Sequence, residues 1–185
     1  IALACTTSDM LDLIGALEAP QGYGQVYGGV KLLPPRPITS MTVGEVMAWQ
    51  RQASKTAVSS AAGRYQVIRA TMQQMVNEGV VSTSDIYSPA TQDKIGRHLL
   101  AQAGYRDGVS SEATLNRVSG IWAALPRVSG PNAGQSTYQG YAGNKALIGA
   151  GDYVDFANCQ VALGEIERIA SAARSGLRFG ANFDD

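Results

Sequence analysis

The chain has 185 residues, of which 45% are apolar and 16% are charged, and its 15 basic residues balance its 15 acidic ones. This length suits one domain with a buried core. The net charge of zero argues against broad electrostatic binding to nucleic acid or anionic lipid, and no run of roughly 18 apolar residues predicts a membrane span.

The first predicted helix runs from about residue 7 to residue 19, with Thr7 or Ser8 as its N-cap. Its apolar stripe at helical spacing consists of Met10, Leu13, Ile14 and Leu17. Glu18 lies on the last turn, where the carbonyl end of the helix dipole disfavours a carboxylate and should raise its pKa. A raised pKa suits a general acid near neutral pH, so Glu18 is either a catalytic acid or a solvated surface residue.

Residues 20–40 are rich in Gly and Pro and predict short strands or a hairpin around QVYGGVKLL, not a helix. A second helix is predicted over about residues 42–54. It opens with a capping box, in which the Glu45 side chain reaches back to the N-cap Thr42. This structural role argues against Glu45 as a catalytic acid.

Further helices are predicted over residues 69–78, 88–104, 111–125 and 152–175. Ser88 caps the helix in which Pro89 fills the first turn, and Pro126 ends the next one. Residues 127–144 form a long loop rich in Gly, Ser, Asn and Tyr, a kind of segment that is usually functional or disordered. The last helix is expected to turn Cys159 inward.

Several kinds of catalytic site lack their residues. The only histidine, His98, falls inside a predicted helix, which argues against a Ser-His-Asp triad. One histidine and two distant cysteines provide no metal-ligand cluster, and the Gly-rich residues 21–29 do not match a phosphate-binding loop. Carboxylate chemistry remains, and we expect neither a metal nor a cofactor.

Motifs along the chain resemble those of one family. A helix ending in Glu precedes GY-x-x-VYGG, SSAAGRYQ (59–66), an S-P-x-x-Q-D helix start and IWAALP (121–126). In this order, over about residues 8–140, they are similar to the lambda-phage endolysin family. That resemblance implies an α+β, lysozyme-like fold, predominantly helical with a small β element after the first helix. We expect a single catalytic domain over residues 1–185, with its core at 7–145 and a C-terminal helix at 152–176.

The resemblance also implies roles for individual residues. It makes Glu18 the single catalytic acid, places Tyr65 and Gln66 in the substrate groove, and puts Ser60 near the reacting sugar. The tyrosines that we interpret as sugar-stacking residues are Tyr23, Tyr27, Tyr138 and Tyr141. The alternative for each tyrosine is ordinary partial burial. For Arg64 the alternatives are binding a substrate carboxylate and pinning the local loop through backbone carbonyls, and we favour the second.

The spacing of acidic residues bears on the reaction, because none occurs between Glu18 and Glu45. An inverting glycosidase needs a second carboxylate about 6.5–9.5 Å from its acid, and a retaining one needs it at about 5 Å. A lytic transglycosylase needs none, since the C6 hydroxyl of N-acetylmuramic acid (MurNAc) is its nucleophile. The sequence therefore favours cleavage of the MurNAc-β-1,4-N-acetylglucosamine bond with a 1,6-anhydro product. The alternatives are a water-using muramidase with Asp85, Asp93 or Asp107 as second acid, and a non-catalytic glycan-binding or virion structural protein.

Peptidoglycan glycan strands are the partner that this function implies. The protein would then face the periplasm or cell wall, after export, delivery by a phage or attachment to a virion or secretion apparatus. In such an oxidising setting we expect a disulfide between Cys5 and Cys159 rather than two separate thiols. Closing so long a loop stabilises a fold by roughly 5 kcal/mol in the chain-entropy model.

Overall fold

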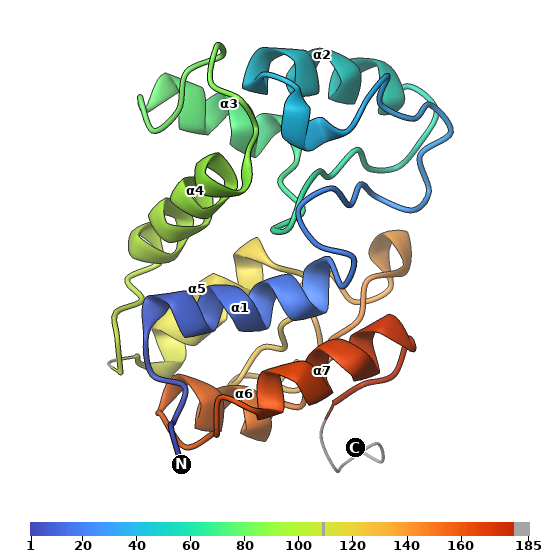
Figure 1. Ribbon diagram of the computed structural model, residues 1–185. Coiled ribbons are helices and arrows are strands. Elements are labelled where there is room, and N and C mark those ends of the chain that lie inside the picture. Colours follow the sequence, from blue (N-terminus) through green and yellow to red (C-terminus); the bar gives the residue numbers. More distant parts are fainter. Residues whose placement is uncertain (109, 180–185) are drawn as a thin grey trace. The chain divides into compact units, whose positions relative to one another are not determined.

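The computed structural model describes residues 1–108 and 110–179, and helices are the main regular structure of these ranges (Figure 1). The helices are α1 (Thr7–Glu18), α2 (Val43–Ala53), α3 (Arg69–Asn77), α4 (Pro89–Gln102), α5 (Glu112–Ile121), α6 (Ala150–Ala157) and α7 (Glu165–Arg174), with short 3-10 turns at η1 (Ile38–Ser40) and η2 (Tyr141–Gly143). The chain divides into two compact units. The first unit is Ile1–Pro20 with Leu99–Asp185, and the second unit is Gln21–His98. That they form a single catalytic domain stays a prediction.

Helix α1 is the central helix of the first unit and packs against α7 (Figure 1). Its N-cap is Thr6, not Thr7 or Ser8, because Thr6 and Asp9 form a capping box by bonding each other's backbone N–H. The Thr7 hydroxyl instead donates to Asp107 at 2.6 Å. The buried residues of α1 are Met10, Leu11, Leu13, Ile14, Gly15, Ala16 and Leu17. Such burial on nearly all faces fixes the helix that ends in Glu18.

Helix α5 ends four residues earlier than predicted, at Ile121 rather than residue 125. Trp122 leaves the helical conformation with φ −118° and ψ 112°. The carbonyl of Pro126 accepts the Ser119 hydroxyl at 2.5 Å, so the chain turns back onto α5 instead of extending it. The Trp122 N–H still bonds the Val118 carbonyl, but the Ala124 N–H lies beyond the helix and bonds a partner outside it.

The C-terminal region forms two helices, so the single helix predicted over residues 152–175 is wrong. Helices α6 and α7 are separated by residues 158–164, where Cys159 adopts a left-handed φ of 60° and is bonded to Cys5. The break pairs with the N-terminal segment, since Ala4 donates to the Val161 carbonyl at 2.8 Å. The helical spacing of apolar residues runs on through residues 158–164, which is why one long helix was predicted. The disulfide and the backbone bond to the N-terminal segment outweigh that local preference.

The loop at residues 127–144 folds back on itself. Arg127 donates to the Gln135 carbonyl, and Gly134 donates to the Arg127 carbonyl, both at 2.8 Å. Farther along, the Tyr141 N–H donates to the Tyr138 carbonyl at 3.0 Å, where the η2 turn begins. Backbone bonds therefore give this loop a defined path.

In the second unit, α2 packs against α3, and isolated β-bridges replace the predicted hairpin at residues 25–33. Val26 pairs with Ala62, far along the chain, and the Tyr27 N–H donates to the Ala61 carbonyl at 2.9 Å. Gly28 and Gly29 lack side chains that would favour a strand. The hairpin prediction was therefore wrong about the partner, although it placed backbone pairing at the right segment.

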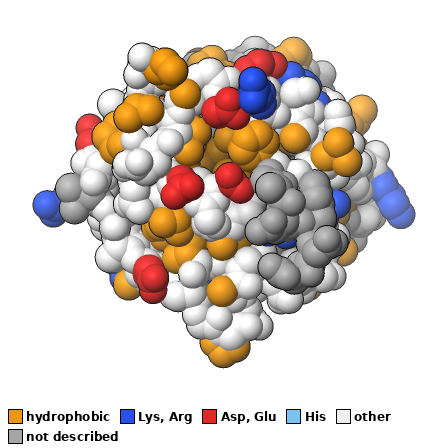
Figure 2. Space-filling model, turned by 90° about the horizontal axis from the view of Figure 1, so that it is seen from below, with side chains coloured by type: hydrophobic (Ala, Val, Ile, Leu, Met, Phe, Trp, Pro, Cys, Tyr) orange, Lys and Arg blue, Asp and Glu red, His pale blue; other side chains and the backbone are white. Residues whose placement is uncertain are grey.

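Local helix signals in the second unit are confirmed. Thr42 and Glu45 form the predicted capping box at the start of α2. Gly79 follows the end of α3 with φ +73°, a left-handed conformation that suits glycine. Among the described residues, no helix is both long and apolar enough to cross a membrane. On the face shown in Figure 2, apolar side chains lie interspersed with acidic and basic ones.

Candidate active site

Glu18 is the last residue of α1, and the chain leaves the helix at Ala19 with φ −140° and ψ 74°. Its Oε1 accepts the backbone N–H of Ala124 at 2.9 Å. Burial raises the pKa of Glu18 to about 7, and the Ala124 hydrogen bond opposes that rise. The sequence predicted this direction from the helix dipole, but the cause that raises the pKa is burial.

Ala124 was missed as a site residue, although it lies within the IWAALP motif. Its N–H reaches Glu18 because α5 has already ended at Ile121. Its carbonyl is also bonded, accepting the Leu147 N–H at 2.9 Å. The residue that donates to Glu18 is thus itself held in place by a backbone bond through its carbonyl. Because the donor is a backbone group, no side chain in the sequence marks it, and the IWAALP motif was the signal that could have drawn attention to Ala124.

The SSAAGRYQ segment makes a tight turn in the second unit. Gly63 has φ +85°, and Gln66 has φ +45°, which is uncommon for a residue with a side chain. The Gln66 carboxamide donates to the Gly63 carbonyl at 2.8 Å and to the Gln25 carbonyl at 3.2 Å. Ser60 is buried, and its carbonyl accepts Nε2 of Gln50 at 3.0 Å. The segment is therefore fixed by amide side chains.

Tyr23, Arg64, Tyr65 and Asp93 form a cluster in the same unit. The hydroxyls of Tyr23 and Tyr65 donate to Oδ1 of Asp93 at 2.8 and 2.6 Å. The Arg64 guanidinium carbon lies 5.1 Å from the Tyr23 ring centre and 5.5 Å from that of Tyr65. Burial and the Asp93 hydrogen bond raise the pKa of both tyrosines. Tyr65 is only 1% exposed, so its ring supports the segment from within.

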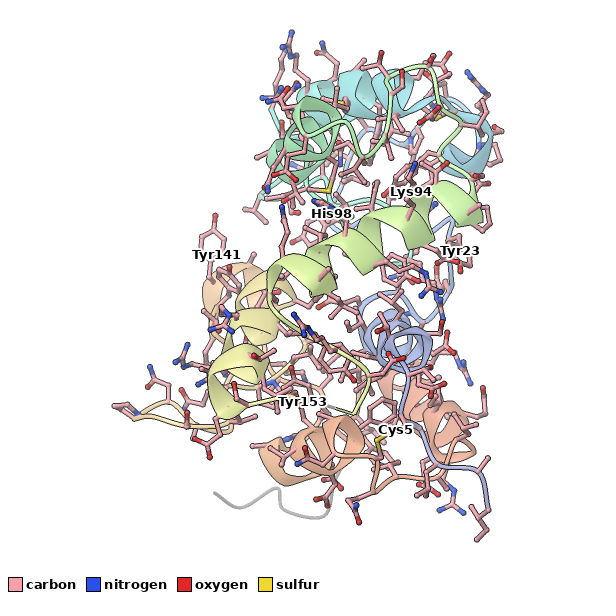
Figure 3. All side chains as sticks on the ribbon, turned by 90° about the vertical axis from the view of Figure 1, so that its left-hand side faces the viewer. Cys5, Tyr23, Lys94, His98, Tyr141 and Tyr153 are labelled. Atoms are coloured by element: carbon pink, nitrogen blue, oxygen red, sulfur yellow. A yellow bond between two sulfur atoms is a disulfide. The ribbon has the colours of Figure 1, made fainter. Side chains whose placement is uncertain are left out.

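The remaining tyrosines are more accessible. Tyr27 is half-buried, and its ring covers Gly29, where a Cβ would meet ring carbon Cε1 at 2.5 Å. Tyr138 and Tyr141 belong to one turn of the first unit and are 41% and 67% exposed. The Tyr138 hydroxyl donates to the Gly120 carbonyl at 2.5 Å, while Tyr141 projects away from the ribbon (Figure 3).

The three aspartates considered as a second acid all have structural hydrogen bonds. Asp85 accepts the Ser82 N–H at 2.8 Å, and Asp107 accepts the Thr7 hydroxyl at 2.6 Å. Asp93 accepts the two tyrosine hydroxyls described above. Within residues 1–108 and 110–179, no group of three or more His, Cys, Asp or Glu side chains could hold a metal ion.

The chain matches the family model described as Endolysin over residues 20–151, which is more than half of its length. This match begins two residues after Glu18 and includes the SSAAGRYQ and IWAALP motifs. No curated protein and no solved structure matches the chain. The chain belongs to the endolysin family, whose members are phage proteins that degrade peptidoglycan.

Proposed function

We propose that the protein is a peptidoglycan lytic transglycosylase with a lysozyme-like fold and with Glu18 as its acid and base. One observation carries the proposal: the Glu18 carboxyl has a pKa of about 7 and a single backbone donor, Ala124, on Oε1. Near neutral pH both its protonated and its ionised forms are populated. A group that first gives and then takes a proton needs both forms.

The proposed reaction uses these two forms in turn. Neutral Glu18 gives its proton to the glycosidic oxygen as the bond from that oxygen to C1 of MurNAc breaks. The C6 hydroxyl of the same MurNAc attacks C1, and its proton passes to the Glu18 carboxylate. The products are a 1,6-anhydro-MurNAc end and a free O4 hydroxyl, with no water consumed. Holding the C6 hydroxyl over C1 provides effective molarities of up to about 10⁵–10⁸ M in well-oriented systems.

The hydrogen bonds of the other acidic residues support transglycosylation over hydrolysis. A water-using muramidase would need a second carboxylate that is free to activate water or to attack C1. Asp85 and Asp107 bond a neighbouring turn and a helix start, and Asp93 bonds Tyr23 and Tyr65. Using any of them as a base would cost these bonds.

The predicted binding residues fall into three kinds by exposure. Tyr141 and Tyr138 present rings to solvent and suit stacking on sugar rings. Gln66, Tyr23 and Tyr27 are half-buried, and each carries a polar group on its side chain. Ser60 and Tyr65, which the resemblance also places near the substrate, are buried and fit a supporting role: Tyr65 through its hydroxyl, Ser60 through its carbonyl.

A cell-wall-facing location agrees with this function. The Cys5–Cys159 disulfide joins the two stretches of chain that make up the first unit, and such bonds persist in oxidising surroundings (Figure 3). We therefore propose that the protein works at the periplasmic side of the wall, delivered by a phage or by export. The alternative is that the protein is attached to a virion, a setting that is equally compatible with the disulfide.

Product analysis in ¹⁸O-labelled water tests the proposal. Digested sacculi should yield 1,6-anhydro-MurNAc ends without solvent oxygen. Glu18→Gln should remove this product, whereas Glu112→Gln, an exposed glutamate at the start of α5, should not. Reducing ends that carry ¹⁸O would refute transglycosylation. Full activity of Glu18→Gln would refute the role of Glu18.

A further inference from the structure

Two neighbouring residues of α4, Gln92 and Asp93, bond to both of the segments that carry predicted glycan-binding residues. These segments are residues 21–27 and 60–67, called here the two binding segments. Both residues belong to the S-P-x-x-Q-D motif at the start of α4, to which the proposed reaction gives no role. All of these residues lie in the second unit.

Gln92 holds the backbones of the two binding segments. Its side chain is buried, with the residue 1% exposed. Nε2 donates to the carbonyls of Tyr23 and Tyr87 at 3.1 and 3.0 Å. Oε1 accepts the N–H of Arg64 at 2.9 Å. Only a carboxamide has two such donors and an acceptor on one group, so glutamate at this position could not make all three bonds.

Gly63 shows how closely Gln92 approaches the second binding segment. A Cβ built on Gly63 would lie 2.3 Å from Oε1 of Gln92. Gly63 also has φ +85°, a conformation that glycine adopts without strain. The turn and the glutamine therefore fit each other, and no larger residue fits between them.

Asp93 holds the side chains of the same two segments. Its Oδ1 accepts the hydroxyls of Tyr23 and Tyr65, and its charge faces the Arg64 guanidinium with an N···O distance of 3.9 Å. Arg64 also donates to both hydroxyls, at 3.2 and 2.9 Å. One carboxylate oxygen thus sets the direction of a tyrosine from each segment.

We infer that Gln92 and Asp93 are positioning residues, which preorganise the two binding segments for the glycan strand and take no part in proton transfer. This inference rests on the proposed glycan-cleaving function. Without the pair, the segments would have to be ordered when substrate binds, and that ordering is subtracted from affinity. The pair therefore acts on binding, while the proton transfers belong to Glu18.

Steady-state kinetics on soluble glycan strands separate this role from a merely structural one. For Gln92→Glu and Asp93→Ala, assayed where melting curves show each variant folded, KM should rise about tenfold or more. Their kcat should stay within about threefold, with an unchanged pH profile. Asp93→Asn keeps an acceptor oxygen and should restore most of the affinity. Lys94→Ala, an exposed neighbour on α4, is the matched control and should behave as wild type (Figure 3).

Binding to an inactive background makes the test independent of the reaction type. In Glu18→Gln protein, adding Gln92→Glu should weaken the Kd for the same glycan about tenfold. If either variant fails to fold, Tyr23→Phe removes one Asp93 bond from a half-buried residue and should raise the Kd by about threefold. A lowered melting temperature with unchanged KM and Kd would overturn the inference. Reducing ends carrying ¹⁸O would overturn the transglycosylase proposal and leave this inference standing.

Discussion

Glu18→Gln should make the protein more stable at neutral pH while it lowers activity by orders of magnitude. Burial raises the pKa of Glu18 from 4.5 in the unfolded chain to about 7 in the fold. Between these values the native state binds more protons than the unfolded state, so the stability of the fold decreases as pH rises from about 4.5 to about 7. Below this window the effect vanishes, and above it the full penalty applies.

The size of the penalty follows from the pKa values. A rise from 4.5 to about 7, at about 1.4 kcal/mol per pKa unit, corresponds to at most about 3.5 kcal/mol. This value is an upper limit on the free-energy penalty, because Glu18 is not fully buried and water screens part of its charge. The glutamine carboxamide carries no charge, and its oxygen can still accept the Ala124 N–H. The variant therefore removes the penalty and keeps the hydrogen bond.

Urea unfolding at pH 4, 6 and 8 measures this difference. Glu18→Gln and wild type should have similar unfolding free energies at pH 4, and the unfolding free energy of the variant should be higher by up to about 3.5 kcal/mol at pH 8. Its kcat should fall by about 10²- to 10⁴-fold, the usual contribution of a general acid. Glu112→Gln should show neither effect. Parallel stability curves for Glu18→Gln and wild type would refute the claim that burial perturbs this carboxyl.

Further outcomes are expected at other places in the fold. The kcat of the wild-type enzyme should fall as pH rises above about 7, because Glu18 must be protonated to act as the acid; a flat profile to pH 9 would contradict this role. Thiol titration should find no free thiol in native protein, and replacing Cys5 and Cys159 by serine should lower the unfolding free energy by roughly 5 kcal/mol or less in urea. Gly63→Ala should lower the melting temperature, since its φ of +85° and the 2.3 Å approach to Gln92 both oppose a Cβ. Tyr141→Ala should weaken glycan binding by about two- to tenfold with unchanged stability, measured by calorimetry on inactive protein.

Much of the helical framework could be predicted because its signals are local. The capping box at Thr42 and Glu45 and the stop at Gly79 each depend on a few neighbouring residues, and the structure has both. The break between α6 and α7 depends instead on residues 2–5, which lie at the other end of the chain. The spacing of apolar residues carries no information about such pairing, so the helix predicted from the sequence ran through Cys159 without a break.

The candidate site was predictable to a similar degree. Glu18 was identified by its place at a helix end, and the direction of its pKa shift is the expected one. Its donor, Ala124, is a backbone group and leaves no side-chain signature. Gln92 and Asp93 were visible as part of a motif, but their bonds to distant segments follow only from the tertiary structure.

The early end of α5 connects the fold to the chemistry of Glu18. Had α5 continued to residue 125, as Pro126 suggested, the Ala124 N–H would have bonded the Gly120 carbonyl four residues back. Each of these two groups has another partner instead: Glu18 takes the N–H, and the Tyr138 hydroxyl donates to the carbonyl at 2.5 Å. Without the Ala124 donor, burial alone would act on Glu18 and its pKa would lie higher still. A carboxyl with a higher pKa is a weaker acid and would give its proton to the glycosidic oxygen less readily. A helix that stops one turn early therefore keeps the pKa of Glu18 close to neutral.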